Sequence, residues 1–366
     1  VHETDRLAEV TKDDVIRVAN KYFTDAYACV YKEQSDRMNA PAVEKPLITP
    51  IVMNRDSSSA FARNLLAMEA EHLNPQFLDF KKDLSITTIG QDIQLLSRVN
   101  TENDLFTLSF IIEQGSNQIP ALQLLPDYMH YLGTDEMSAP DLQVALYALA
   151  SDMSIAPQGD DTRLTISGLQ ENLPATLALL EQWVLTAQAD EDIYLELVRD
   201  AIHAHTIAKT DQSACFDALT DCGMDGFEAV RRMTLTPDKM AALDGEQLLG
   251  LLRSLLPQIS RIVYYGPASE KAITKVLATS QFVQMADPAA RVKPELIAHE
   301  VVATPEVWVA PYDAPALYLM SYANWGETYD VKDEAIIRLF NEYFSGSMGS
   351  VVFQEMREAR SLASHA

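Results

Sequence analysis

Residues 84–113 read LSITTIGQDIQLLSRVNTENDLFTLSFIIE, and the order of apolar and turn residues in them sets the fold class. The runs Leu84–Ile89 and Ile93–Arg98 flank the dipeptide Gly90-Gln91, an arrangement typical of a β-hairpin. A third run, Leu105–Glu113, alternates apolar and polar residues only partly, which predicts a strand covered on both faces. We therefore expect three strands at the start of the regular part of the chain.

Helices and further strands follow in an order typical of α+β folds. One helix is expected over Pro120–Leu132, ended by Gly133, and the next begins at the N-cap residue Ser138. The remaining elements are two strands, a long helical stretch broken near Asp190, three helices and a last strand: Met153–Pro157, Arg163–Leu169, Pro174–Ala208, Gln212–Cys222, Pro237–Ala242, Glu246–Leu255 and Arg261–Tyr265.

The chain before residue 78 carries fewer signals. Thr11 starts a capping-box pattern ahead of a helix that reaches Tyr22, and Ala26–Tyr31 has the composition of a strand. Three prolines punctuate the polar residues 34–77, which predicts a linker. One short helix is expected in it, with an N-cap supplied by the run Ser57-Ser58-Ser59.

The order of elements starts again beyond residue 300. Strands at Val307–Ala310 and Leu317–Ala323 are expected before a helix at Val331–Phe344. Landmarks of the two blocks also correspond, namely an inner strand, a helix-ending glycine and an opening helix–strand pair: Phe106 with Leu317, Gly133 with Gly346, and Val30 with Val263. A repeat of roughly 200 residues indicates duplicated domains and not a solenoid.

The composition excludes several functional classes. The chain has 28 Lys and Arg against 53 Asp and Glu, a formal net charge of −25, so its surface repels nucleic acid and anionic lipid. The longest uncharged stretches, Gln114–Pro126 and Ala314–Gly326, have 13 residues each, fewer than the ~20 that a membrane-spanning helix needs. Cys29, Cys215 and Cys222 are too few for a disulfide framework and are expected to be buried.

No motif in the chain indicates a catalytic centre. The seven histidines include no pair three or four residues apart, the spacing that a helical zinc site needs. A nucleophile elbow, a Walker loop and a dinucleotide fingerprint are also missing. Arg357 follows the Gly-rich turn 345–350. Helical spacing by itself predicts that Arg357 and Arg360 lie on a solvated helix face and pair with nearby glutamates.

One segment nevertheless resembles a known family. Residues 340–363, FNEYFSGSMGSVVFQEMREARSLA, resemble the C-terminal-half signature of the insulinase-like (pitrilysin, M16) zinc metallopeptidases. Leu124–Thr134 with the Ser138 helix, and Ile259–Pro267, are similar to the repeating unit of that family. The resemblance covers nearly the whole chain and is weakest over residues 34–77.

This resemblance implies repeated α+β units of the M16 type, shared with LuxS and the processing peptidases. Each unit is a mostly antiparallel sheet with helices packed on one face, and four units in two halves close like a clamshell around a peptide chamber. The implied domains are the end of the second unit, the inter-half linker, a complete third unit of the inactive type, a second linker and the start of the fourth unit: residues 1–33, 34–77, 78–283, 284–299 and 300–366.

The zinc motif of the family is degenerate in this chain. Catalytic halves carry His-x-x-Glu-His on one helix, where both His bind zinc and the Glu polarises the zinc-bound water. Aligned on Gly133-Thr134, those positions are Leu124, Asp127 and Tyr128. The resemblance therefore implies zinc in the N-terminal half of a parent protein, and no metal or cofactor in this segment.

The inactive half of the family lends an Arg and a Tyr, seven residues apart, to the substrate or the developing oxyanion. Arg357 matches the Arg, whereas Ser364 stands at the Tyr position. A serine hydroxyl is too short to replace a phenol across a cleft. Either another group substitutes for the Tyr, or this contribution is lost.

The resemblance thus implies the zinc-less C-terminal half of an M16-like metalloendopeptidase, which closes the chamber and positions peptide for a zinc site in the N-terminal half of the same parent chain. The alternative is a catalytically inactive M16-like structural or substrate-binding partner, like some core subunits of respiratory complexes. The net charge favours cationic peptides as substrates. The chain begins at Val1 without a leader pattern, which suggests a piece of a longer protein and is compatible with a periplasmic or secreted parent.

Overall fold

The computed structural model describes residues 6–7, 9–31, 58–69, 74–75, 77–314, 316–326 and 330–363. The chain divides into two compact units, residues 1–75 and 76–366. In the first unit, helix α2 (Lys12–Tyr22) begins with the predicted capping box, because Thr11 and Asp14 each accept from the other's backbone N–H. Helix α3 (Ala60–Leu66) has Ser59, the last of the three serines, as its N-cap.

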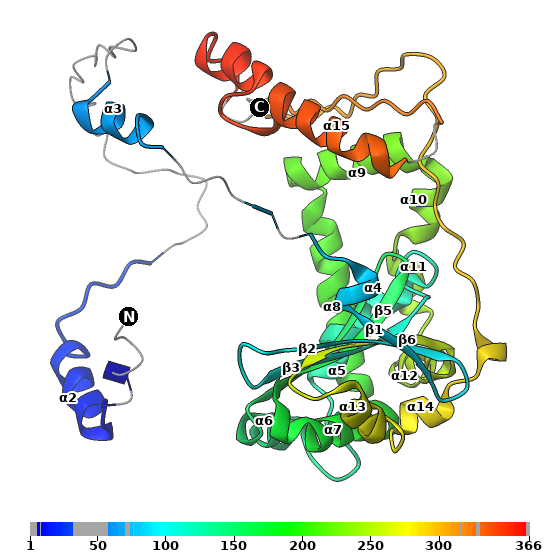
Figure 1. The fold of residues 1–366 in the computed structure, drawn as a ribbon. Helices are drawn as coiled ribbons and strands as arrows, with labels where there is room; N and C mark the ends of the chain where they lie inside the picture. The colour runs from blue at the N-terminus through cyan, green and yellow to red at the C-terminus, as the bar shows by residue number, and fades with distance from the viewer. Residues whose placement is uncertain are drawn as a thin grey trace. The chain divides into compact units, whose positions relative to one another are not determined.

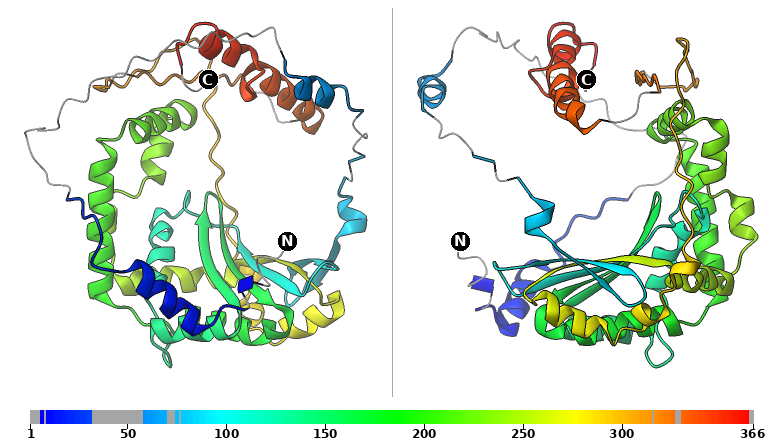
Figure 2. Two further views of the ribbon diagram at one scale, coloured as in Figure 1. Left: turned by 90° about the vertical axis from the view of Figure 1, so that its left-hand side faces the viewer. Right: turned by 45° about the vertical axis from the view of Figure 1, so that its right-hand side comes forward.

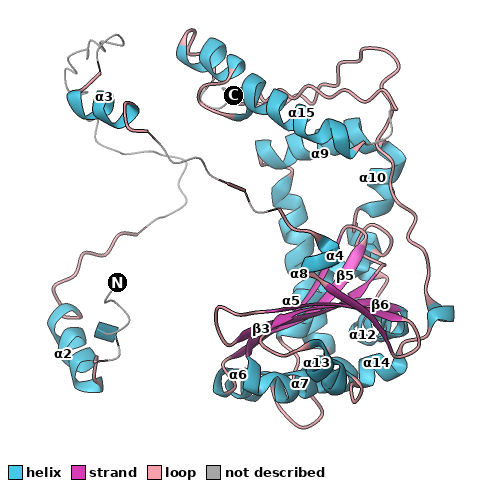
Figure 3. Cartoon of the chain, in the orientation of Figure 1, coloured by secondary structure: helices cyan, strands magenta, loops and turns pink. Residues whose placement is uncertain are grey.

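The second unit is built on one six-stranded mixed sheet (Figures 1 and 3). Its strands are β1 (Ser85–Ile89), β2 (Ile93–Val99), β3 (Leu105–Ile112), β4 (Ser151–Gln158), β5 (Asp161–Leu169) and β6 (Ile259–Gly266). The spatial order is β1-β2-β6-β3-β5-β4, and every neighbouring pair is antiparallel except β2 with β6. The predicted hairpin forms β1 and β2, and its turn uses Gly90 at a φ of +58°, where glycine is favoured.

Helices cover one face of this sheet (Figure 1). These helices are η1 (Pro120–Leu124), α5 (Leu125–His130), α6 (Ala139–Ala148), α7 (Leu173–Thr186), α12 (Gly245–Leu255), α13 (Glu270–Leu277) and α14 (Gln281–Met285). The core between the layers takes alternate residues of each strand; on β3 these are Phe106, Leu108, Phe110 and Ile112, all at most 1% exposed. The predicted α+β fold, a mostly antiparallel sheet with helices on one face, is confirmed.

A helical arm leads away from the sheet layer (Figure 2). It consists of α8 (Glu191–Ala208), α9 (Gln212–Asp225), α10 (Phe227–Met233) and α11 (Pro237–Ala241). Asp190 lies at the predicted helix break and is the N-cap of α8, where its side chain accepts from the Ile193 N–H at 3.1 Å.

The remaining elements are short or lie near the C-terminus. They are α4 (Phe80–Asp83), η2 (Gln170–Asn172), η3 (Leu256–Gln258), η4 (Pro288–Ala290), α15 (Val331–Asn341) and the π-helical segments η5 (Glu342–Gly346) and η6 (Phe353–Glu358). No helix in the described ranges combines the length and the apolar character that crossing a bilayer requires.

Several local predictions are wrong. Ala26–Tyr31, Val307–Ala310 and Leu317–Ala323 form no strands, because a strand exists only beside a hydrogen-bonded neighbour and the described chain gives them none. Strand β3 is covered on one face only, since its other face is exposed or half-buried. Cys29 is exposed, whereas Cys215 and Cys222 are half-buried. The expected domain boundaries, including a fourth unit from residue 300, stay predictions.

Candidate functional site: helix α5 and the hollow beside it

The three residues that align with the zinc motif lie on and just before α5. Leu124 is 5% exposed and Tyr128, one turn later, is fully buried, whereas Asp127 is exposed. The positions assigned to the two metal ligands therefore face the protein core. The position assigned to the general base faces away from it.

Tyr128 joins three helices. Its hydroxyl accepts from the Asp190 N–H at 2.9 Å and donates to the Asp190 carbonyl at 3.1 Å. Its ring meets the ring of Tyr194 edge-on, with centroids 5.7 Å apart. A Cβ placed on Gly245, the first residue of α12, would lie only 2.1 Å from the Tyr128 hydroxyl oxygen. Tyr128 thus packs α5 against the start of α8 and the start of α12.

The surroundings of Tyr128 do not suit a metal. Burial raises the pKa of Tyr128, and burial together with nearby Glu191 raises that of Tyr194 to about 12, so both phenols stay protonated. The Tyr194 hydroxyl donates to the Met240 carbonyl at 3.0 Å. No group of three His, Cys, Asp or Glu side chains that could hold a metal ion exists among the described residues.

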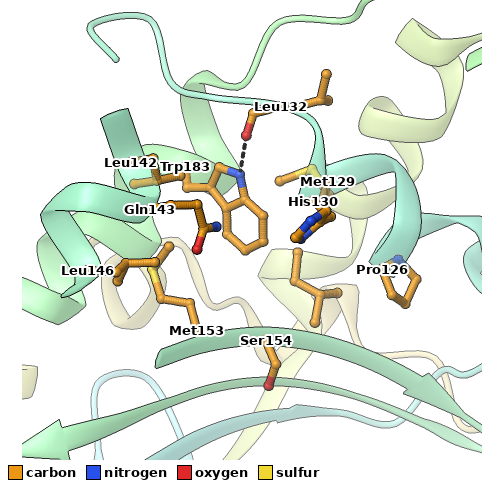
Figure 4. Close-up of a pocket in the computed structure, with 11 residues that line it drawn as sticks. Pro126, Met129, His130, Leu132, Leu142, Gln143, Leu146, Met153, Ser154 and Trp183 are labelled. Atoms are coloured by element: carbon orange, nitrogen blue, oxygen red, sulfur yellow. Dashed lines mark hydrogen bonds between the residues drawn. The ribbon is translucent and has the colours of Figure 1, made fainter. Parts of the chain in front are cut away.

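A small hollow of about 160 Å³ lies beside α5 (Figure 4). It is lined from α5, the loop after it, α6, α7 and β4, mostly by apolar side chains: Pro126, Met129, His130, Leu132, Leu142, Gln143, Leu146, Met153, Ser154, Ile155 and Trp183. The Trp183 indole donates to the Leu132 carbonyl at 2.9 Å and so fixes one wall. The volume is below the ~300 Å³ of typical small-molecule sites, so the hollow suits one side chain.

The hollow adjoins an edge of the sheet. Strand β4 is the last in the spatial order, so one side of its backbone has no partner strand in the described chain. Met153, Ser154 and Ile155 of this strand also line the hollow. An open strand edge beside a pocket for one side chain is the combination that strand addition of a peptide uses.

Arg357 lies in the π-helical segment η6. Its guanidinium carbon is 4.7 Å from the centre of the Phe353 ring, and its Nε is 3.9 Å from a carboxylate oxygen of Glu358. Arg360 pairs with Glu355 in the same segment. These contacts agree with the solvated helix face expected from the sequence. Ser364 lies outside the described residues.

Sequence reasoning missed the partners of Tyr128. Asp190, Tyr194 and Gly245 lie more than 60 residues further along the chain, and no local pattern ties them to α5. His130 is exposed at the wall of the hollow, and no local pattern marked it as a lining residue.

Comparison with known proteins adds a fold assignment. No family model and no curated protein matches the sequence. The inactive domain of an M16 peptidase from Pseudomonas fluorescens has a similar structure, with a TM-score of 0.57 and 15% identity, over 77% of this chain and 69% of that one. A protease from Helicobacter pylori gives a TM-score of 0.59 and 12% identity, over 77% of this chain and 70% of that one.

This chain has the M16 peptidase fold. The periplasmic protease PqqL from Escherichia coli shares it, with a TM-score of 0.51 and 14% identity over 82% of this chain. The chain spans only 31% of the length of PqqL. At such identities the M16 likeness concerns the fold, and activity has to be argued from the site.

Proposed function

We propose that this chain is the non-catalytic half of an M16-like metalloendopeptidase. It closes the peptide chamber and positions substrate for a zinc site in the N-terminal half of the same parent protein. The observation that carries this proposal is the fate of the zinc motif. Leu124 and Tyr128 stand at the ligand positions, and Tyr128 is committed to the backbone of Asp190.

Peptide positioning in this proposal uses the β4 edge and the hollow beside it. Main-chain groups of β4 pair with an extended peptide, and the hollow receives one of its side chains. Because main-chain groups supply most of the bonds, this mode of binding tolerates many sequences. The parent protein is periplasmic or secreted in this proposal, as the E. coli structural neighbour is periplasmic.

Arg357 contributes to the substrate or the oxyanion in this proposal. Its guanidinium already lies on Phe353 and near Glu358, so it has to leave the weak 3.9 Å contact with that carboxylate to reach a substrate. The serine at position 364 favours the second candidate function, a catalytically inactive partner that captures substrate or has a structural role.

The test is a peptidase assay on the full-length parent, with and without a chelator, beside this segment alone. We expect chelator-sensitive turnover from the parent and none from the segment. Turnover by the segment alone would contradict the proposal. A parent that binds peptide but never cleaves it would favour the inactive partner.

The role of the hollow is tested in the same assay with Gln143→Trp, because the exposed Gln143 side chain lines the hollow from α6 (Figure 4) and a larger ring there fills it. Val144→Trp is the matched control, because Val144 is exposed on the same helix but does not line the hollow. We expect Gln143→Trp to raise KM several-fold with little change in kcat. Equal kinetics for the two variants would exclude the hollow from substrate binding.

A further inference from the structure

A second and larger groove lies in the helical arm, away from α5. It has a volume of about 550 Å³, within the ~300–1,000 Å³ range of ligand sites. One wall comes from α9 and α10, whose place in the fold Figure 1 shows, and the other from residues within 300–308 and 318–322. Its aromatic lining consists of Phe216, Phe227, Trp308, Tyr318 and Tyr322.

Specific contacts hold the two walls together. The Glu300 N–H donates to the Met224 carbonyl at 2.6 Å, and His299 Nδ1 lies 2.6 Å from an Asp225 carboxylate oxygen. The rings of Phe216 and Tyr318 meet edge-on across the groove with centroids 5.5 Å apart. The groove is therefore shaped by both walls.

The charged groups of the groove are all of one sign. Glu300 and Glu306 line it, and no Lys or Arg does so among the described residues. Asp217, Asp221 and Asp225 follow the same helix α9 at four-residue spacing. Burial, with repulsion from Asp225 and Asp217, raises the pKa of Asp221. Asp225 contacts His299, whereas the other four acids have no salt-bridge partner among the described residues, so a ligand that brings a cation is favoured.

The wall beyond residue 300 also offers free main-chain groups. Between residues 303 and 307, all of which are described, no backbone N–H or C=O has a hydrogen-bond partner in the described chain. An extended peptide can pair with several such N–H and C=O groups in register, whereas a small cation can contact only one or two of the carbonyls.

We propose that this groove binds an extended peptide segment that carries Lys or Arg. The cationic side chain lies on the aromatic walls between Glu300 and Glu306, and the peptide backbone pairs with residues 303–307. The site lies on helices other than α5 and needs no zinc. It stands whether or not the chain works beside a catalytic half.

The test is a titration of the isolated chain, followed by Trp308 fluorescence and by calorimetry. The probes are a capped peptide that alternates Val and Arg, the same peptide with uncharged citrulline in place of Arg, and arginine amide. We expect the Arg peptide to bind most tightly, with an affinity that falls as salt is added. Trp308→Phe should remove the fluorescence change and weaken the calorimetric affinity, because Trp308 lines the groove and its indole donates to Glu306 at 3.1 Å.

Three variants locate the site. Glu300→Gln combined with Glu306→Gln should weaken the Arg peptide roughly fivefold or more, since two charge contacts are lost. Thr220→Arg places a cation of the chain's own in the groove and should compete with the peptide. Glu196→Gln, an exposed acid on α8, is the matched control and should change nothing.

Each other outcome overturns the proposal. Equal affinity for the citrulline peptide would show that the positive charge of Arg does not contribute to binding. Arginine amide binding as tightly as the peptide would point to a small organic cation instead. Unchanged affinity in the glutamine double variant, with the far-UV spectrum intact, would place binding elsewhere on the acidic surface.

Discussion

Replacing Tyr128 by Phe is the sharpest test of the view that the zinc helix has become a structural element. The change removes one oxygen atom and leaves the ring, with its edge-on contact to Tyr194, in place. It deletes the hydrogen bonds to the N–H and the carbonyl of Asp190. These bonds connect α5 to the N-cap of α8.

The expected cost follows from these two bonds. Each net hydrogen bond contributes ~0.5–1.5 kcal/mol, so Tyr128→Phe should lower the free energy of unfolding by about 1–3 kcal/mol. Tyr147→Phe is the matched control, because this tyrosine is 88% exposed. The control should stay within about 0.5 kcal/mol of the wild type.

The assay is denaturant unfolding followed by the fluorescence of buried Trp183. A companion variant, Gly245→Ala, puts a methyl group 2.1 Å from the Tyr128 oxygen and should also destabilise the fold. Because Tyr128→Phe removes that oxygen, Gly245→Ala should cost less in the Phe background than in the wild type. A Tyr128→Phe variant as stable as Tyr147→Phe, or strictly additive costs, would refute the reasoning.

Two further predictions concern charge and metal. Glu181 is buried and accepts from the Ser280 hydroxyl at 2.6 Å, and burial raises its pKa above the ordinary 4.5. The folded state therefore holds this proton more tightly than the unfolded state, so stability falls as the pH rises through the raised pKa. Glu181→Gln should flatten that fall in unfolding curves from acid to neutral pH, and an unchanged slope would contradict it. The isolated chain should retain far less than one zinc per molecule by elemental analysis after dialysis against zinc; one tightly bound zinc would overturn the alignment at Leu124 and Tyr128.

The sheet and most helices were predictable because their signals are local. The β1–β2 hairpin follows from the apolar runs around Gly90. The N-cap side chains of Ser59, Ser138 and Asp190 each accept a hydrogen bond from the backbone N–H three residues later. Such signals need only a few neighbouring residues. They therefore do not depend on contacts with distant parts of the chain.

The errors and gaps concern long-range contacts. Leu317–Ala323 has strand composition, but a strand also needs a partner that composition does not reveal. The positions of Leu124 and Tyr128 on one helix could be predicted from local spacing, whereas the bond from Tyr128 to Asp190 spans 62 residues. The sequence could therefore place Tyr128 on a helix, but it could not show which backbone groups its hydroxyl binds.

The position of β6 has a consequence for how the chain reaches this fold. Strands β2 and β3 are consecutive in sequence, yet β6, which begins at Ile259, lies between them. During synthesis, β1–β2 and β3–β5–β4 are complete long before β6 leaves the ribosome. Until then, the edges of β2 and β3 that later pair with β6 have no partner strand. A fragment that stops before Ile259 leaves the edges of β2 and β3 unpaired. Such edges can pair with the wrong strand of the same chain or with another molecule.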